Sequence, residues 1–432
     1  MLKEQIKNTI QLAYPVIIGQ LGVIMMGVVD SLMVGKLGSA PLASAALGNS
    51  ITFLFFIIGF GVAMAVTPLV AISVGAKKLE ECGVYFRQAL LVNFTLGIIL
   101  TAIVVLASEF IPLLNQPDEV QVLSSSYTKI LGLSAVPTMV FLTYKHFIEG
   151  LSVMRPAMII TLIANLVNAF ANWLLIYGNL GFPALGLDGA GWATFASRTF
   201  MAVMLMNYVM KNKKFDQYDV SFHYKSINVP VIKKILRLGL PSGFQYFFEI
   251  GAFSFAVVMV GWLGEKQQAA HQIAINLASI SFMAALGISL AGSILVGNAV
   301  GRQDITETRR AGFVAILLGA SIMAIAGIIF ISLHNFLPTL YVDDEVANSF
   351  ASTLIIIAAM FQLSDGVQAV GIGILRGLTD VKIPTVITFT AYWIVGLPVG
   401  YILGFIFNLD VSGVWIGLLL GLTTSAILLT LR

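Results

Sequence analysis

Long, uninterrupted apolar stretches are the feature that most constrains the fold of this chain. A helix needs about 20 predominantly apolar residues to cross the hydrocarbon core of a bilayer. Stretches of about this length lie near residues 10–34, 44–74, 89–108, 124–148, 157–177, 190–210, 235–262, 268–299, 311–333, 350–374, 384–407 and 411–431. They are continuous rather than alternating, unlike the strands of a membrane β-barrel. The sequence therefore predicts an all-α membrane protein with about 12 transmembrane helices.

The composition supports a membrane protein. Of the 432 residues, 58% are hydrophobic and only 10% are charged, whereas a soluble domain usually carries about 25% charged residues. The first apolar stretch is too long for the core of a secretory signal peptide, and it contains Asp30. We therefore expect this stretch to be retained as the first helix.

The residue clusters that mark most enzyme classes do not occur in this sequence. The single cysteine, Cys82, excludes a disulfide framework. The 4 histidines are far apart, and none has a metal-binding spacing. The sequence contains no G-x-x-x-x-G-K-[ST] motif, so nucleotide hydrolysis is not expected. We predict no enzyme activity, no cofactor and no nucleic-acid partner.

The two halves of the sequence repeat each other. Pro15 and Pro241 are separated by 226 residues, and the same offset relates V-G-x-L-G at 34–38 to the same pattern at 260–264. The offset persists over more than 100 residues with almost no gaps. A duplicated helical unit explains this regularity.

Each repeat holds about six helices, and this even number lets both halves insert with the same polarity. We therefore predict two six-helix lobes related by a pseudo-twofold axis along the membrane normal. The N-terminal lobe is placed at residues 1–220, with part of a polar cytoplasmic linker, and the C-terminal lobe at 221–432. A substrate path between the lobes would open alternately to the two faces of the membrane.

The distribution of basic residues predicts the orientation. With the N-terminus in the cytoplasm, only Lys36, Lys129 and Lys266 of the 24 lysines and arginines fall outside. Arg198 lies within a helix, and the others, including Lys225 in the linker, fall inside. Because cytoplasmic loops are enriched in Lys and Arg, we predict a multi-pass protein of the inner (cytoplasmic) membrane with a cytoplasmic N-terminus.

Three carboxylates, those of Asp30, Glu249 and Asp365, stand inside apolar stretches. Burying an ionised side chain in a bilayer costs from about 3 to more than 10 kcal/mol. Arg198 is the only basic residue predicted within a helix, so a salt bridge would neutralise at most one of the three. The others would be protonated, hydrated or bound to an exchangeable cation. A structural role stays open for each carboxylate taken singly.

Two asparagines and two rows of glycines follow helical spacing. Asn168 and Asn172 lie four residues apart and share one helix face. Amide oxygens beside a carboxylate suit hard cations, although interhelical hydrogen bonding is an equally good interpretation. Small residues at every fourth position favour close helix packing, and they occur at Gly396, Gly400, Gly404, Gly413, Gly417 and Gly421.

Several motifs together resemble the multidrug and toxic compound extrusion (MATE) family, in its NorM-like branch, over essentially the whole chain. The motifs are V-V-D-S-L-M-V-G at 28–35, F-I-E-G-L-S-V-M-R-P at 147–156, N-x-x-x-N at 168–172, F-F-E at 247–249, A-A-H-Q-I-A-I-N at 269–276, and the run Q-x-x-D-x-x-Q…G-x-L-R-G-x-x-D from 362 to 380. Each motif is weak alone, whereas the combination is specific.

The resemblance implies a two-lobe antiporter that expels organic cations. It implies that Asp30, with Asn168, Asn172 and Thr194, is similar to the cation site of the family's N-terminal lobe. It further implies that Glu249 and Asp365 resemble the acidic pair of the C-terminal lobe. Asp30, Glu249 and Asp365 are also the expected substrate-binding residues, because a cationic drug would be attracted to a carboxylate.

The predicted function is secondary active export of cationic amphipathic drugs and toxic organic compounds, hence antibiotic resistance, driven by Na⁺ or H⁺. The residues leave both coupling ions open, and no metal other than Na⁺ is expected. The expected partners are small organic cations and the lipid bilayer, and the expected oligomeric state is a monomer. A lipid-linked oligosaccharide flippase of related architecture is the alternative, but it would need a basic central cavity, whereas the buried charges are mainly acidic.

Overall fold

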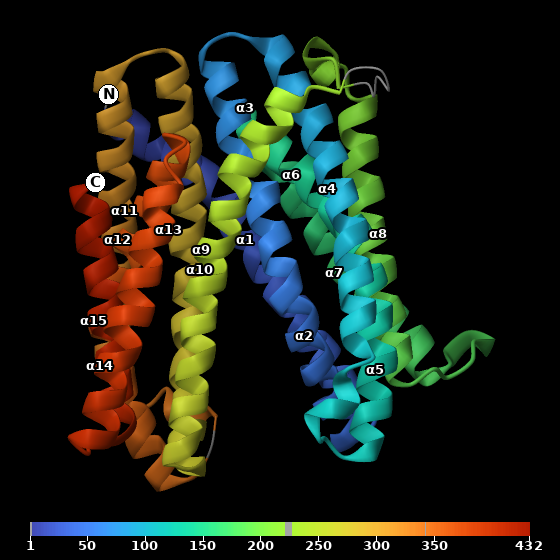
Figure 1. Ribbon diagram of the computed structural model, residues 1–432, viewed down its shortest axis with the longest axis vertical. Coiled ribbons are helices and arrows are strands. Elements are labelled where there is room, and N and C mark those ends of the chain that lie inside the picture. The colour runs from blue at the N-terminus through green and yellow to red at the C-terminus, as the bar shows by residue number, and fades with distance from the viewer. Residues whose placement is uncertain (1, 221–226, 342) are drawn as a thin grey trace. The chain divides into compact units, whose positions relative to one another are not determined.

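The computed structural model describes residues 2–220, 227–341 and 343–432, and these are almost entirely helical with no strand (Figure 1). The first half contains α1 (Leu2–Gly35), α2 (Ser39–Met64), α3 (Val66–Gly75), α4 (Leu79–Ser108), α5 (Asp118–Leu133), α6 (Ala135–Gly150), α7 (Arg155–Tyr177) and α8 (Leu187–Lys211). The second half contains α9 (Val229–Leu263), α10 (Glu265–Gly301), α11 (Ile305–Leu333), α12 (Glu345–Gly377), α13 (Lys382–Phe389), α14 (Leu397–Tyr401) and α15 (Asp410–Leu431).

Short irregular helical segments complete the described chain. Two π-helical segments, Thr390–Gly396 and Ile402–Ile406, flank α14, and together with α13 and α14 they make one continuous helical run, Lys382–Ile406. Short 3₁₀ segments occur at Ile111–Leu114, Asn179–Gly181, Lys213–Tyr218 and Pro338–Leu340. The predicted all-α fold is therefore confirmed for the described residues.

The helices agree with the number of predicted spans. Ten helical runs in the described residues are long and apolar enough to cross a membrane, judged by length and composition. The other two predicted spans correspond to α5 with α6 and to α8. Lys225 is predicted to lie on the cytoplasmic side, but it falls in segment 221–226, outside the described residues. The lobe boundary predicted at 220/221 borders the same segment.

Two helices of the first half are interrupted where their counterparts in the second half are continuous. The break between α2 and α3 follows Met64, and the break between α5 and α6 follows Leu133. Pro68 and Pro137 lie four residues after these two positions. A proline ring clashes with the carbonyl four residues earlier and cannot donate a hydrogen bond to it. The second half has no proline at the corresponding positions, so α10 and α12 run without a break.

The duplication is visible in the backbone as well as in the sequence. Gly38 and Gly264, which are 226 residues apart, precede α2 and α10 with φ of 126° and 145°. Lys77 and Gln303, also 226 apart, have φ of 58° and 59°. The two repeats therefore share the backbone geometry of these turns, even where the side chains differ, as at Lys77 and Gln303.

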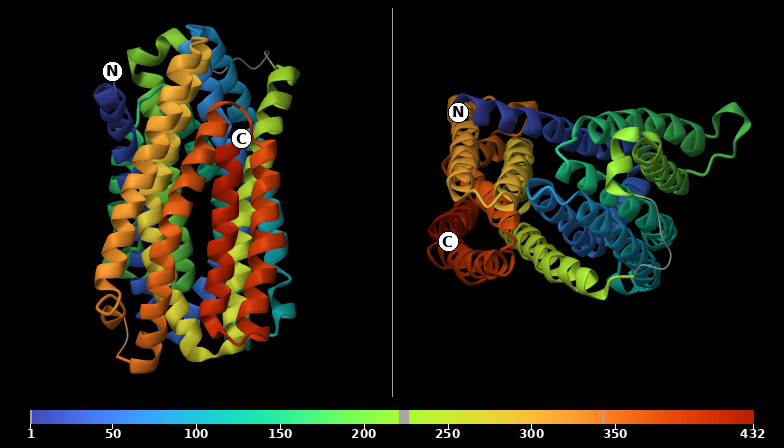
Figure 2. Two further views of the ribbon diagram at one scale, coloured as in Figure 1. Left: turned by 90° about the vertical axis from the view of Figure 1, so that its left-hand side faces the viewer. Right: turned by 90° about the horizontal axis from the view of Figure 1, so that it is seen from above.

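The chain divides into two compact units. One comprises Met1–Ile17 and Phe244–Arg432, and the other comprises Ile18–Gly243. Each unit contains most of one half of the chain, together with the leading turns of α1 or α9 from the other half. The lobe boundary at 220/221 stays a prediction. In the first unit, α12 packs on α10, α11 and α15, and these helices form a bundle when viewed end-on (Figure 2, right).

The predicted glycine packing is confirmed in the first unit. Gly413 and Gly417 of α15 face the backbone of the helical run that contains Gly400 and Gly404. A methyl group added at Gly417 would lie 2.3 Å from the Gly400 Cα, and one added at Gly413 would lie 2.4 Å from the Gly404 backbone nitrogen. No side chain fits at either position, so the spacing serves close helix approach.

Candidate functional site

The Asp30 carboxylate lies among neutral polar side chains of three helices. Asp30 is on α1, and the Asn172 Nδ2 of α7 donates to its Oδ1 at 2.5 Å. The Thr194 hydroxyl of α8 donates to the other carboxylate oxygen at 3.4 Å. Asn168, one turn before Asn172, accepts from the same Nδ2 at 3.2 Å. The structure therefore brings together all four residues predicted for the N-terminal lobe.

The amide groups around Asp30 leave polar atoms without partners. Asn168 and Asn172 are fully buried, and the Asn168 Nδ2 and Asn172 Oδ1 atoms make no hydrogen bond within the described chain. A buried polar atom without a partner is costly. Rotating the Asn172 amide would turn its oxygen toward Asp30, an arrangement that either a bridging cation or a proton on the Asp30 carboxyl would stabilise. The donor set of carboxylate, amide and hydroxyl oxygens suits a hard cation such as Na⁺.

The Glu249 carboxylate is held by a hydrogen-bonded chain of two residues. Gln368 of α12 donates from Nε2 to the Glu249 Oε1 of α9 at 2.9 Å. The same amide exchanges hydrogen bonds with the hydroxyl of Tyr392, at 2.9 and 3.1 Å. Gln368 and Tyr392 are fully buried, and Glu249 is 8% exposed. The hydrogen bonds that position Glu249 thus come from neutral side chains.

Asp365 lies three residues before Gln368 on α12, on the same helix face, and is 7% exposed. It forms no side-chain hydrogen bond to any residue that the structure describes, and it interacts electrostatically with Glu249. The structure therefore brings together the two acids predicted for the C-terminal lobe. Two carboxylates in one buried site repel each other unless a proton or a cation neutralises one of them.

Arg376 is a second buried basic side chain near the acidic residues, besides Arg198, which was the only one predicted within a helix. The span predicted to end at residue 374 continues to Gly377, so Arg376 is inside α12 and is 5% exposed. Its guanidinium lies over the Tyr246 ring, 5.5 Å from the centroid, and interacts electrostatically with Glu249. Neutralisation by a basic residue is therefore available to Glu249 as well.

Family models and curated relatives agree with this architecture. The model described as MatE matches residues 15–174 and 241–402. The chain belongs to the MatE family. This MatE chain is 34% identical to the probable multidrug resistance protein NorM of Mesorhizobium japonicum, over all of this chain and 94% of that protein. It is 33% identical to the multidrug resistance protein MdtK of Yersinia enterocolitica, over 99% of this chain and 94% of that protein.

Solved structures show the same fold. The crystal structure of the eukaryotic MATE transporter AtDTX14 superposes with a TM-score of 0.89 at 21% identity, covering all of this MatE chain and 95% of the other. A crystal structure of MATE in the bent conformation superposes with a TM-score of 0.91 at 20% identity, covering 98% of this chain and 94% of the other. The family and NorM-like branch expected from the motifs are confirmed.

Sequence reasoning missed three residues of the MatE C-terminal site, namely Gln368, Tyr392 and Arg376. Gln368 closes the Q-x-x-D-x-x-Q run, and its spacing from Asp365 was a usable signal. Tyr392 gave no signal, because its hydroxyl reaches Gln368 from within a π-helical segment. Arg376 was misplaced by a helix boundary.

Proposed function

We propose that this MatE chain is a secondary multidrug antiporter. It exports cationic amphipathic drugs and toxic organic compounds in exchange for Na⁺ or H⁺ by alternating access. The similar NorM and MdtK proteins, which are named for multidrug resistance, support this proposal. The observation that carries it is that each unit holds a carboxylate against neutral donors, Asp30 with Asn172 and Glu249 with Gln368.

The coupling follows from competition for negative charge. A Na⁺ ion or a proton at Asp30, or at the Glu249–Asp365 pair, cancels the charge that would attract a cationic drug. The ion and the drug therefore disfavour each other's binding in the same transporter. A membrane potential contributes about 2.3 kcal/mol per elementary charge per 100 mV to inward ion flow. Release of the ion on the inner side then frees the carboxylates for the next drug molecule.

Replacing the acids of the C-terminal site tests the proposal. Glu249→Gln and Asp365→Asn remove a titratable, cation-binding oxygen pair while retaining side-chain size. We expect each variant to lose most ion-driven efflux of a cationic dye from proteoliposomes. Asp343→Asn, at an exposed carboxylate outside the helices, is the matched control and should transport normally. Wild-type rates in both site variants would refute the assigned role.

Separately imposed gradients identify the coupling ion. One set of vesicles carries a Na⁺ gradient at equal pH, and a second set carries a pH gradient without Na⁺. Oxygen ligands around Asp30 favour Na⁺, whereas the Glu249–Asp365 pair can also exchange a proton. If neither the Na⁺ gradient nor the pH gradient drives dye efflux, antiport itself would be contradicted.

The membrane, orientation and oligomeric state belong to the same proposal. We place the chain in the inner membrane with its N-terminus in the cytoplasm, on the basis of the lysine and arginine distribution. A monomer is the expected oligomeric state. A cysteine introduced at Lys3 in a Cys82→Ala background should react with a membrane-impermeant maleimide only after the cells are permeabilised. Reaction in intact cells would reverse the orientation. A flippase is disfavoured, because its lipid-linked phosphates would meet the acidic sites described above.

A further inference from the structure

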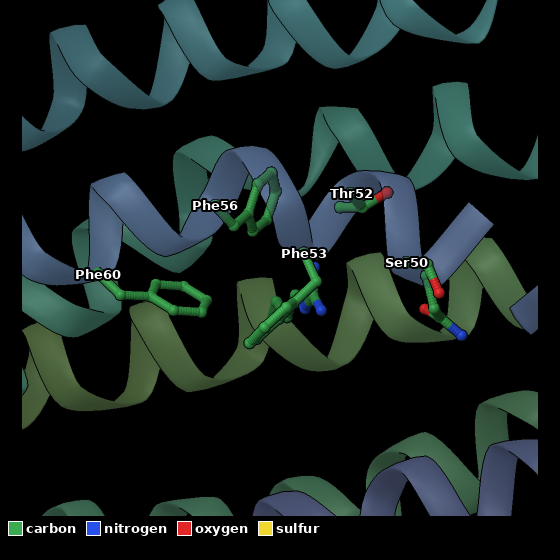
Figure 3. A pocket seen from close by; sticks show the side chains of 7 residues that line it. Ser50, Thr52, Phe53, Phe56 and Phe60 are labelled. Carbon is green, nitrogen blue, oxygen red and sulfur yellow. The ribbon is translucent and has the colours of Figure 1, made fainter. Parts of the chain in front are cut away.

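A cavity in the unit Ile18–Gly243 carries a charge that the proposed antiport mechanism does not use. Its volume is about 330 Å³, and its wall combines Phe53, Phe56 and Phe60 with short polar side chains of α2 and with Arg198 of α8. Figure 3 shows the three rings along one side of α2, with Thr52 and Ser50 farther along the same helix. Apolar walls with a few convergent polar groups are typical of small-molecule sites.

Arg198 is the only charged residue in the wall of this cavity. Its Nη1 donates to the Ser134 hydroxyl at 2.6 Å, and its guanidinium carbon lies 5.7 Å from the centroid of the Phe56 ring. Within the described chain it forms no ion pair with a carboxylate, although Asp30 lies near enough to interact electrostatically. A guanidinium has five N–H donors, so Arg198 retains donors for a ligand in the cavity.

The charge and shape of the cavity select the ligand. A cationic group would be repelled by Arg198, whereas a carboxylate would form a charge-assisted hydrogen bond to it. The phenylalanine rings provide edge and face contacts for a planar aromatic ligand, and the Phe53–Phe60 and Phe56–Phe60 pairs already meet edge to face at 6.2 Å. Phe53 is 44% exposed, so its ring is available for such a contact.

We propose that this cavity binds the carboxylate group of a small aromatic amphiphile, with Arg198 as the residue that determines specificity. The inference rests on the proposed export function, which it extends from cations to aromatic carboxylates and zwitterions. The carboxylate of the ligand satisfies the guanidinium, and the aromatic ring lies against Phe53. A carboxylate bound there also offsets the repulsion between Arg198 and a cation at Asp30.

A pair of fluorescent probes isolates the carboxylate. Dansylglycine carries it, and dansylglycinamide has the same ring system with a neutral amide. Both are titrated into the purified chain in a non-ionic detergent, without a gradient. We expect the wild-type chain to bind dansylglycine about tenfold more tightly, the gain typical of a charge-assisted hydrogen bond. Equal affinity for the two probes would overturn the proposal.

Variants assign the preference to named side chains. Arg198→Gln should bind both probes equally, and Arg198→Lys should keep part of the preference because it retains the charge without the planar fork. Phe53→Ala should weaken the binding of both probes to the same degree. Lys129→Gln, at an exposed lysine paired with Glu109, is the charge control and should keep the preference. The proposal would be overturned if Arg198→Gln still bound dansylglycine more tightly than dansylglycinamide. It would also be overturned if Lys129→Gln lost this preference.

An anionic lipid is the competing source of a negative group. Phosphatidylglycerol added at stoichiometric amounts should not displace dansylglycine, and phosphatidylcholine is the neutral control. Displacement by phosphatidylglycerol alone would make the cavity a lipid site and overturn the proposal. The titration uses no ion gradient, so its outcome is separate from the efflux test of Glu249 and Asp365. Normal efflux in those variants, with the Arg198 preference intact, would refute the role assigned to the two acids and leave the carboxylate site standing.

Discussion

Asp30 obtains its hydrogen bonds from neutral side chains, and this determines what the carboxylate can do. A salt bridge would neutralise it permanently, whereas Asn172 and Thr194 orient it without cancelling its charge. The unpartnered Asn172 Oδ1 adds an oxygen that no described residue uses. A site of this kind can bind a cation and release it again.

Truncating Asn172 should weaken Na⁺ binding at Asp30. Asn172→Ala removes a donor at 2.5 Å and one potential cation ligand. Loss of an oxygen ligand weakens the coordination of a hard cation, so the Na⁺ concentration for half-maximal dye efflux should rise about tenfold, the equivalent of about 1.4 kcal/mol. Asn165→Ala is the matched control, because Asn165 lies on the same helix and donates to the Thr161 backbone carbonyl instead. An unchanged ion dependence in Asn172→Ala would contradict the site.

The individual site residues could be predicted to different extents. Asp30, Glu249 and Asp365 were conspicuous because a carboxylate in an apolar stretch is costly. Asn168 and Asn172 followed from helical spacing, and Thr194 from the family resemblance alone. Gln368 and Tyr392 could not be identified as partners of Glu249, because their contact depends on how α9, α12 and a π-helical segment pack.

At the scale of elements, the π-helical segment Thr390–Gly396 positions Tyr392 for the acidic site. A π-helical turn is wider than an α-helical one and is frequent at functional sites. Tyr392 is fully buried there, and its hydroxyl both donates to and accepts from Gln368. The neighbouring Trp393 donates from Nε1 to the Phe248 carbonyl at 2.9 Å, which joins the same segment to α9.

Removing the Tyr392 hydroxyl should destabilise this arrangement. Tyr392→Phe leaves the buried Gln368 amide without one donor and one acceptor, so we expect a loss of about 1–3 kcal/mol in the free energy of unfolding in detergent. Efflux should fall as well, because Gln368 would no longer orient Glu249. Tyr401→Phe, at a residue that is 47% exposed, is the control and should match the wild type. Equal stability of Tyr392→Phe and wild type would argue against the chain of hydrogen bonds.

Helix boundaries were the least predictable part of the elements, and proline explains one class of them. The breaks after Met64 and Leu133 follow from Pro68 and Pro137. Hydropathy alone cannot show them, because both sides of each break are equally apolar. The same limitation cut the predicted span short of Arg376, whose long side chain is buried although its charge suggested a membrane surface.

At the scale of the whole molecule, duplication preserved the backbone and diversified the chemistry. At the offset of 226 residues, Glu249 corresponds to Val23, which is 54% exposed, and Asp30 corresponds to Ala256, which is fully buried. At the offset of 227, the buried Glu149 corresponds to the buried Arg376. The repeat therefore predicts the helix order of both halves, but it cannot transfer a site from one half to the other.

The shared turn geometry makes a symmetric prediction. Gly38, with φ 126° and ψ 178°, and Gly264, with φ 145° and ψ 170°, lie in a region that is essentially restricted to glycine. Gly38→Ala and Gly264→Ala should each lower the free energy of unfolding in detergent by about 1–3 kcal/mol. Gly27→Ala is the control, because no heavy atom outside its own helix backbone and chain neighbours lies within 4 Å of the added methyl. Loss of stability in only one of the pair would show that the turns are not equivalent.

The leading turns of α1 and α9 are exchanged between the two compact units, and this bears on how a single repeat could fold. Each compact unit takes its first turns from the other half of the chain, and the changeover falls after Ile17 and after Gly243, which are 226 residues apart. A half-length ancestor built on this plan could not have completed its own bundle as a single polypeptide. We therefore expect a half-length chain of this design to form its bundle only by exchanging opening turns with a second copy.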